Sequence, residues 1–293
     1  MLMLKRVVVC LCSLVIFALL VSVNIASGID VAICTVSYPW PQDVYDAEIA
    51  VVTDAIRGVT NLQSFGEDDL DALADWVESH TSGEKNTLIL TGIFPSTIYA
   101  PENVEPDGSL IEEFLDAGNT IITTAEYPFY TIEGRIEANE DAALKNILDA
   151  PQAEMWQGRE GWRENPIWVI MTPTADGKRL IPGIKEYKIN FPMHVEDYDG
   201  TSWELEIAVS GNTDENLRVE GVILNTETGG RFGAFVEAPW VDPGDVGMSW
   251  GTIMSGYLLN YYLPEVVSVQ ADGKLVSTWG RSRLSSKTDV QAC

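Results

Sequence analysis

The sequence predicts an α/β fold built on a doubly wound, mostly parallel sheet. Short apolar runs alternate with stretches of helical apolar spacing through the first half of the chain, and each run is too short for a helix and ends at a turn or breaker. This alternation is typical of a parallel sheet covered by helices on both faces. The second half departs from it and predicts an added β-hairpin.

The stretch from residue 87 to residue 130 carries the clearest β-α-β pattern. Thr87–Gly92 and Asn119–Ala125 are apolar runs of strand length, and Ser109–Gly118 between them has apolar residues at helical spacing. Ser109 is the expected N-cap of that helix and Gly118 its stop. The two strands should therefore be parallel.

Ligands bind at the carboxyl ends of the strands in open parallel sheets. In this chain those ends correspond to residues 93–96 and 126–130, so a site is expected there.

The elements on either side of this unit follow in order. Asp30–Val36 predicts a buried strand, and the helix after it stops at Gly58. Thr60–Phe65 predicts a short strand and Glu67–His80 a helix with acids at its start, where the helix dipole favours them. Asp141–Leu148 predicts a further short helix.

The second half predicts mostly strands. Ile167–Met171 is a short apolar run, Asp176-Gly177 and Tyr198–Gly200 are turn signals, and Trp203–Val209 alternates with period two. The expected hairpin joins Val222–Asn225 to Arg231–Val236.

A largely apolar helix over Ser249–Leu263 closes the domain. The predicted organisation is a single α/β domain over 29–264, with a first half at 29–150 and an elaborated second half at 151–264. A polar C-terminal tail follows at 265–293.

Residues 1–28 predict a secretory signal. Lys5 and Arg6 precede an apolar run from 7 to 23, and small residues follow at 26–28. We expect cleavage and a secreted or periplasmic location with no stable membrane span afterwards; the alternative is an uncleaved anchor.

The formal net charge of −26 argues against nucleic acid and anionic membrane surfaces as partners. Cys10 and Cys12 lie in the leader, so only Cys34 and Cys293 remain in the mature chain. Two cysteines so placed predict neither a disulfide framework nor a thiolate metal site. Because no His/Asp/Glu spacing matches a zinc or calcium motif, no metal and no cofactor is expected.

Several features together resemble the class I glutamine amidotransferase-like superfamily, which has a flavodoxin-like fold. They are the alternating first half, Val222–Val236 with Gly229-Gly230-Arg231, and the closing helix Thr252–Tyr262. The phrases Leu88–Tyr99 and Glu113–Ile122 are similar to those of an uncharacterised group of exported bacterial proteins. The resemblance covers about residues 30 to 264.

The catalytic signature of that superfamily is missing. Its catalytic members carry a cysteine on a tight Gly-x-Cys-x-Gly turn after a central strand, assisted by a histidine and an acid. The corresponding turn, Thr124–Pro128, has no cysteine and no flanking glycines, and the sequence contains no Gly-x-Ser-x-Gly. Glutamine hydrolysis by that route is not expected.

Aromatic and polar residues follow the first, third and fourth predicted strands and should converge at one edge of the sheet. Stacking on aromatic rings beside acids suits sugars and other small ligands; the equally weighted alternative is that the rings pack the loops against the sheet. The candidate ligand-binding residues at this edge are Tyr38, Trp40, Phe94, Ser96, Tyr99, Glu126, Tyr127 and Tyr130.

Glu126, His194 and Arg231 each have a functional and a structural interpretation. Glu126 is a candidate general base or ligand contact, against a solvated loop acid. His194 is a candidate base or metal ligand, against a packed or exposed loop histidine. Arg231 is a candidate contact for an anionic ligand group, although pairing with a carboxylate is favoured.

Two functions from different classes follow. The favoured one is an exported, non-catalytic domain that binds a small ligand such as a carbohydrate, or a protein partner. The alternative is a hydrolase or sugar-processing enzyme that uses carboxylate acid–base chemistry. A clustered pair of carboxylates with raised proton affinity favours the enzyme, and a shallow aromatic platform without such a pair favours binding.

Overall fold

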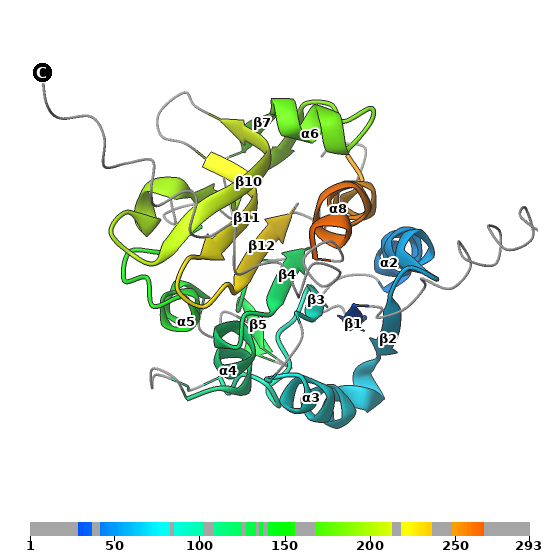
Figure 1. The fold of residues 1–293 in the computed structure, drawn as a ribbon, viewed down its shortest axis with the longest axis vertical. Helices are drawn as coiled ribbons and strands as arrows, with labels where there is room; N and C mark the ends of the chain where they lie inside the picture. The colour runs from blue at the N-terminus through cyan, green and yellow to red at the C-terminus, as the bar shows by residue number, and fades with distance from the viewer. Residues whose placement is uncertain are drawn as a thin grey trace, which may run out of the picture.

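A ten-stranded mixed sheet forms the centre of the molecule (Figure 1). The computed structural model describes residues 29–36, 42–82, 85–101, 103, 108–124, 127–132, 135–136, 140–155, 168–212, 218–235 and 248–266. The strand order is β2-β1-β3-β4-β12-β11-β10-β7-β8, with β9 paired to β11. From β2 to β12 neighbouring strands are parallel, and from β12 to β8 they are antiparallel. The first five positions match the flavodoxin-like order, with β12 in fifth place.

The first half alternates strand and helix as the sequence predicts. Its elements are β1 (Asp30–Cys34), α2 (Gln42–Ile56), β2 (Asn61–Phe65), η1 (Glu67–Asp69), α3 (Leu70–Ser79), β3 (Thr87–Thr91), α4 (Leu110–Asp116), β4 (Thr120–Thr124), β5 (Thr131–Ile132), β6 (Arg135–Ile136) and α5 (Glu140–Ile147).

The second half is mainly antiparallel. Its elements are β7 (Val169–Pro173), α6 (Ala175–Leu180), β8 (Tyr187–Ile189), β9 (Met193–His194), η2 (Val195–Tyr198), β10 (Trp203–Asn212), β11 (Arg218–Asn225), β12 (Arg231–Phe235), α8 (Trp250–Tyr257) and the π-helical η3 (Leu258–Tyr262).

Helices cover both faces of the sheet, so the chain has two hydrophobic cores. Leu73 of α3, Phe114 of α4 and Leu144 of α5 belong to the core on one face. The core on the other face lies beneath α2, α6 and α8, which Figure 1 shows on the opposite side. Burying one large aliphatic or aromatic side chain contributes about 1.5–3 kcal/mol, so both cores stabilise the sheet. The doubly wound arrangement is confirmed.

The predicted hairpin is confirmed and has a second role. β11 and β12 pair antiparallel, with Leu224 opposite Arg231. β12 also pairs parallel with β4, with Arg231 beside Thr120. The hairpin therefore supplies the fifth parallel strand and starts the antiparallel half of the sheet.

Two local predictions were wrong. Asp176-Gly177, expected in a turn, lies inside α6, where a Cβ on Gly177 would sit 1.8 Å from the carbonyl oxygen of Val209. The glycine thus serves close packing of α6 on β10 rather than chain reversal. His194, expected in a connection, ends the short strand β9. The other turn signal is confirmed, since Gly200 has a φ of +82°.

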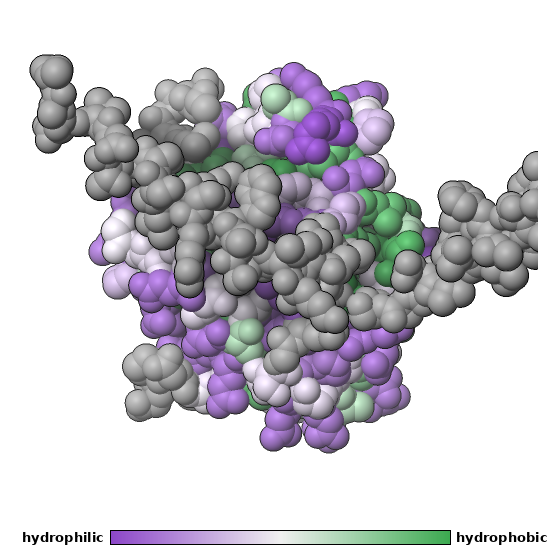
Figure 2. Space-filling model, viewed as in Figure 1, coloured by the Kyte–Doolittle hydropathy of each residue, from purple (hydrophilic) through white to green (hydrophobic). Residues whose placement is uncertain are grey.

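Where Figure 2 colours the described residues, the surface is mostly hydrophilic, with an apolar area over α2, where Val51 is 41% exposed. Among the helices that the structure describes, none combines the length and the apolarity that crossing a bilayer requires.

The capping box of α4 provides a first prediction. Ser109 Oγ accepts the backbone N–H of Glu112 at 3.4 Å, and Glu112 Oε2 accepts the backbone N–H of Ser109 at 2.6 Å. Ser109→Ala is expected to lower the free energy of unfolding by about 1–2 kcal/mol, because it removes the cap and a partner of the buried Glu112. Urea denaturation measures this loss. Ser82→Ala, at an exposed position, should change stability by under about 0.5 kcal/mol, and equal losses in both variants would contradict the capping role.

Candidate functional site

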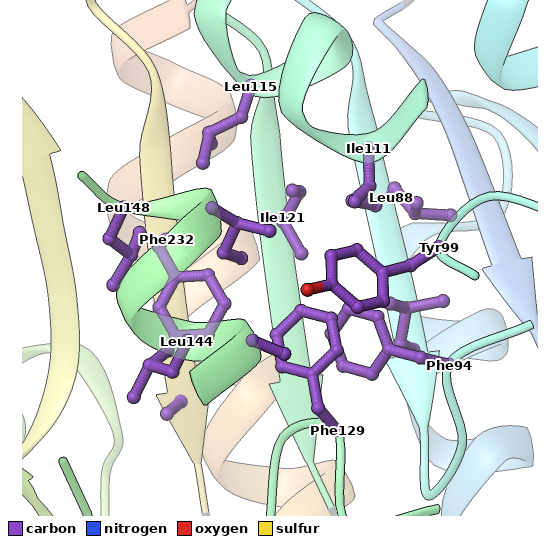
Figure 3. Close-up of a cluster of buried hydrophobic side chains, with 14 of the residues drawn as sticks. Leu88, Phe94, Tyr99, Ile111, Leu115, Ile121, Phe129, Leu144, Leu148 and Phe232 are labelled. Atoms are coloured by element: carbon purple, nitrogen blue, oxygen red, sulfur yellow. The ribbon is translucent and has the colours of Figure 1, made fainter. Parts of the chain in front are cut away.

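Aromatic side chains meet at the carboxyl ends of β3 and β4, as the sequence predicts (Figure 3). Phe94 and Phe129 stack with their ring centroids 3.8 Å apart, and the Tyr99 ring lies 4.7 Å from Phe129. Tyr99 Oη donates a hydrogen bond to Asn146 Oδ1 at 3.0 Å, which ties this cluster to α5. Phe94 and Tyr99 are 3% and 0% exposed, so both rings pack the loops onto the sheet.

Tyr127 extends this cluster toward the second half of the chain. Its hydroxyl donates to Asp141 Oδ1, and its ring meets Phe191 edge-on at 5.0 Å. Tyr130 is also buried, whereas Ser96 is half-buried.

The described aromatics therefore form no open stacking platform, and a ligand-binding role for them stays a prediction. The remaining candidates at this edge, Tyr38, Trp40 and Glu126, lie outside the described residues.

Phe129 has a strained backbone. Its φ of +64° is in the left-handed region, which costs an ordinary side chain about 1–2 kcal/mol. The stack on Phe94 holds the ring in place despite that cost. Strained residues concentrate at functional loops, and this one follows β4 at the edge where a ligand is expected.

A histidine and two carboxylates converge at the same edge. His194 Nδ1 lies 3.5 Å from Asp197 Oδ2 and 3.8 Å from Glu154 Oε1, and all three donor atoms are within 4.8 Å of one another. The side chains of His194, Asp197 and Glu154 are 5%, 17% and 49% exposed, so the group runs from the interior to the surface. We call these three residues the His194 group.

Strand pairing places the His194 group beside the aromatic cluster. In the pairing of β9 with β11, His194 stands opposite Arg218, the first residue of β11. Because β11 runs antiparallel to β12 and β4, its start lies where β4 ends. Phe191, which contacts Tyr127, precedes His194 by three residues. The group and the aromatics thus occupy one edge of the sheet.

The environment shifts the proton affinity of two members of the group. Burial, followed by the positive charge of Arg218, lowers the pKa of His194 to about 4, so the imidazole is neutral at pH 7. Burial, followed by the negative charges of Glu154 and Glu196, raises the pKa of Asp197 to about 6. The backbone N–H of Glu154, which donates to Asp197 Oδ2 at 3.2 Å, opposes part of that rise.

Within the described ranges, the His194 group is also the one place where at least three His, Cys, Asp or Glu side chains bring metal-ligating atoms together. His194 was predictable as a candidate from the sequence, whereas Glu154 and Asp197, which are 43 residues apart in the chain, were not. The one local signal was the spacing of three between His194 and Asp197, which a helical turn brings close.

Arg231 lies at the opposite edge of the sheet, at the amino end of β12. Its Nε and Nη2 donate to Glu206 at 2.8–3.0 Å, and the two side chains are 5% and 8% exposed. Arg231 therefore pairs with a carboxylate, as the sequence analysis favoured, and does not join the candidate site.

Cys34 is buried in β1, where burial raises the pKa of its thiol to about 11. A thiol that stays protonated at neutral pH is a poor nucleophile. Among the described residues, this cysteine cannot supply the thiolate of the amidotransferase reaction.

A separate cavity of about 550 Å³ lies between α2 and β2, at the far end of the sheet from the His194 group. Asp46, Thr53, Arg57 and Ser64 are among its lining residues. Every polar residue in this lining is at least partly exposed, and Arg57 pairs with Asp54, so the described lining has no buried polar group comparable to His194.

Comparison with known proteins gives a distant structural likeness. No family model matches the chain, and no curated protein matches it. The chain is similar to a solved structure from Bacteroides uniformis that is described as ThuA-like. The match spans 81% of this chain and 93% of the Bacteroides chain, with a TM-score of 0.43 and 7% sequence identity. ThuA proteins form a class I glutamine amidotransferase-like family. Nothing about the function of this chain follows from so distant a likeness.

Proposed function

We propose that this chain binds a small hydroxyl-bearing ligand, such as a carbohydrate, at the carboxyl edge of its sheet. The observation that carries the proposal is the convergence of Glu154 with His194 and Asp197, from two segments far apart in the chain, onto one point that opens to solvent through Glu154. Carboxylate oxygens accept hydrogen bonds from hydroxyls, and a neutral imidazole can donate or accept one. The leader-like residues 1–28 place this binding outside the cytoplasm in our proposal.

Two further observations support this edge. Ligands of open α/β sheets bind beyond the carboxyl ends of the parallel strands, and the His194 group lies there. The strained Phe129 follows Glu126, a proposed ligand contact, by three residues in the sequence.

The placement of the two carboxylates favours binding over cleavage of a glycosidic bond. A glycosidase holds its two carboxyl groups on either side of the bond that it cleaves. Glu154 Oε1 and Asp197 Oδ2 instead both lie beside one imidazole nitrogen, His194 Nδ1, at 3.8 and 3.5 Å. This geometry suits contact with a single atom better than attack from two sides.

A hydrolase or sugar-processing enzyme is the second candidate function. The observation that favours it is the carboxylate pair beside a neutral imidazole, since such clusters serve acid–base chemistry. The absence of an aromatic platform among the described residues points the same way.

A thermal-shift screen against sugars, amino acids and nucleotides tests the proposal. A ligand that binds only the folded state raises the melting temperature, and we expect a sugar to do so. Glu154→Gln and Glu126→Gln should fold normally and lose most of that shift, whereas Glu204→Gln, an exposed acid on β10, should keep it.

No shift with any sugar, or a shift retained in Glu154→Gln, would overturn the assignment of this edge. A large drop in the melting temperature of unliganded Glu126→Gln would make Glu126 structural. Turnover of the sugar that binds would favour the second candidate.

A further inference from the structure

We propose that Glu154, His194 and Asp197 form a binding site for a divalent metal ion of the zinc type, with coordination positions left open. The role of the ion rests on the proposed function, because an open coordination position of the ion would bind a hydroxyl oxygen of the ligand. The metal site itself depends only on the geometry of the His194 group.

Two of the three donor-atom separations in the group are close to those of a zinc site. Zinc bonds of about 2.0–2.1 Å in tetrahedral geometry hold the ligand atoms about 3.3 Å apart. His194 Nδ1 lies 3.5 Å from Asp197 Oδ2 and 3.8 Å from Glu154 Oε1. Both separations exceed the ordinary hydrogen-bond range. A small inward movement of the half-exposed Glu154 side chain completes the site.

The chain holds the three donors with unequal freedom. His194 ends a strand of the central sheet and its side chain is 95% buried, so the imidazole is fixed. Asp197 lies in η2, and the backbone N–H of Glu154 donates to its Oδ2 at 3.2 Å. Outer contacts of this kind orient metal-ligating carboxylates. Glu154 at the rim can close over the ion.

The donor set selects the class of metal. One imidazole nitrogen and two carboxylate oxygens suit zinc and neighbouring transition metals, whereas calcium prefers six to eight oxygens. Two carboxylate charges balance a divalent ion. The nearby cation Arg218 is offset by Glu196, 2.6 Å away. The formal net charge of −26 further favours cations at the surface.

The second histidine of the chain provides a matched control. His80 Nε2 lies 3.4 Å from Asp30 Oδ2, and no third donor of the described residues joins them. His80 therefore resembles His194 in having a carboxylate neighbour but lacks a metal-sized group.

The test uses the full chain without a polyhistidine tag, stripped with EDTA and titrated with Co²⁺ and then Zn²⁺. We expect one equivalent of Co²⁺ to bind with the visible absorption of a low-coordinate site, without the thiolate charge-transfer bands that the cysteines would give. Zn²⁺ should displace it. His194→Ala and Glu154→Gln should weaken Zn²⁺ binding in calorimetry by about 10–100-fold or more, and His80→Asn should leave it unchanged.

Absence of stoichiometric Co²⁺ binding, or equal affinities in the wild type and in Glu154→Gln, overturns the metal site. Because Glu154 is half-exposed, Glu154→Gln should fold. The comparison of its metal affinity with that of the wild type therefore remains decisive even if His194→Ala does not fold. If a sugar raises the melting temperature in EDTA and Co²⁺ does not bind, the metal site is wrong and the proposed function stands. If Co²⁺ binds and no sugar raises the melting temperature, the proposed function is wrong and the metal site stands.

Discussion

Glu206→Ala is expected to lower the free energy of unfolding by about 3–5 kcal/mol, because it leaves Arg231 buried without its counter-ion. Arg231 makes three hydrogen bonds to the Glu206 carboxylate through Nε and Nη2. Arg231 Nη1 already lacks a hydrogen-bond partner among the described residues, so the remaining neighbours are poorly placed to replace Glu206. Glu265, 3.5 Å from Nη2 and 39% exposed, compensates only in part.

Urea unfolding followed by tryptophan fluorescence measures this loss. Asp54→Ala breaks the exposed pair between Arg57 and Asp54 and should cost under about 1 kcal/mol. Removing both buried charges together, as Arg231→Met with Glu206→Leu, should recover much of the stability. A cost of Glu206→Ala no larger than that of Asp54→Ala would show that the buried pair is not formed.

Gly177→Ala is expected to destabilise the protein by about 2–3 kcal/mol. In an exposed helix this change would stabilise by about 1 kcal/mol, because alanine is the better helix former. Here the new Cβ would lie 1.8 Å from the carbonyl oxygen of Val209 in β10, so α6 must move away from the sheet.

Chemical denaturation of Gly177→Ala and Gly66→Ala separates the effect of close packing from the conformational preference of alanine over glycine. Gly66 has a φ of −91°, and the nearest atom to a Cβ there would be 3.8 Å away. Its substitution should cost under about 1 kcal/mol. Stabilisation by Gly177→Ala would contradict the close contact between α6 and β10.

The β-α-β unit was predictable from sequence because its signals are local. The runs that became β3 and β4 are short and consist of threonine, leucine and isoleucine, and Ser109 and Gly118 mark the ends of α4. Convergence of Phe94 and Tyr127 followed from the rule that parallel strands end at one edge. The burial of these rings was not predictable from the sequence. The alternation of strands and helices indicates that the strands are parallel, but it does not indicate which loops cover the edge of the sheet.

Other features depend on contacts between distant segments. Glu154 and Asp197 are 43 residues apart in the chain, and they meet where the backbone N–H of Glu154 donates to Asp197 Oδ2. Glu206 faces Arg231 at an irregularity in the pairing of β10 with β11, which no local pattern announces. Asp176-Gly177 is a dipeptide typical of turns, but Gly177 packs closely against Val209 of β10, a strand that comes later in the chain.

The most direct test of the His194 group uses the imidazole ¹H–¹⁵N correlations of the ¹⁵N-labelled protein, since the chain has two histidines. Adding one equivalent of Zn²⁺ should shift the ring nitrogens of His194 and leave those of His80 unchanged, and adding the sugar that binds should perturb His194 again. Shifts confined to His80, or none at either ring, would contradict the assignment of the functional site to this edge of the sheet.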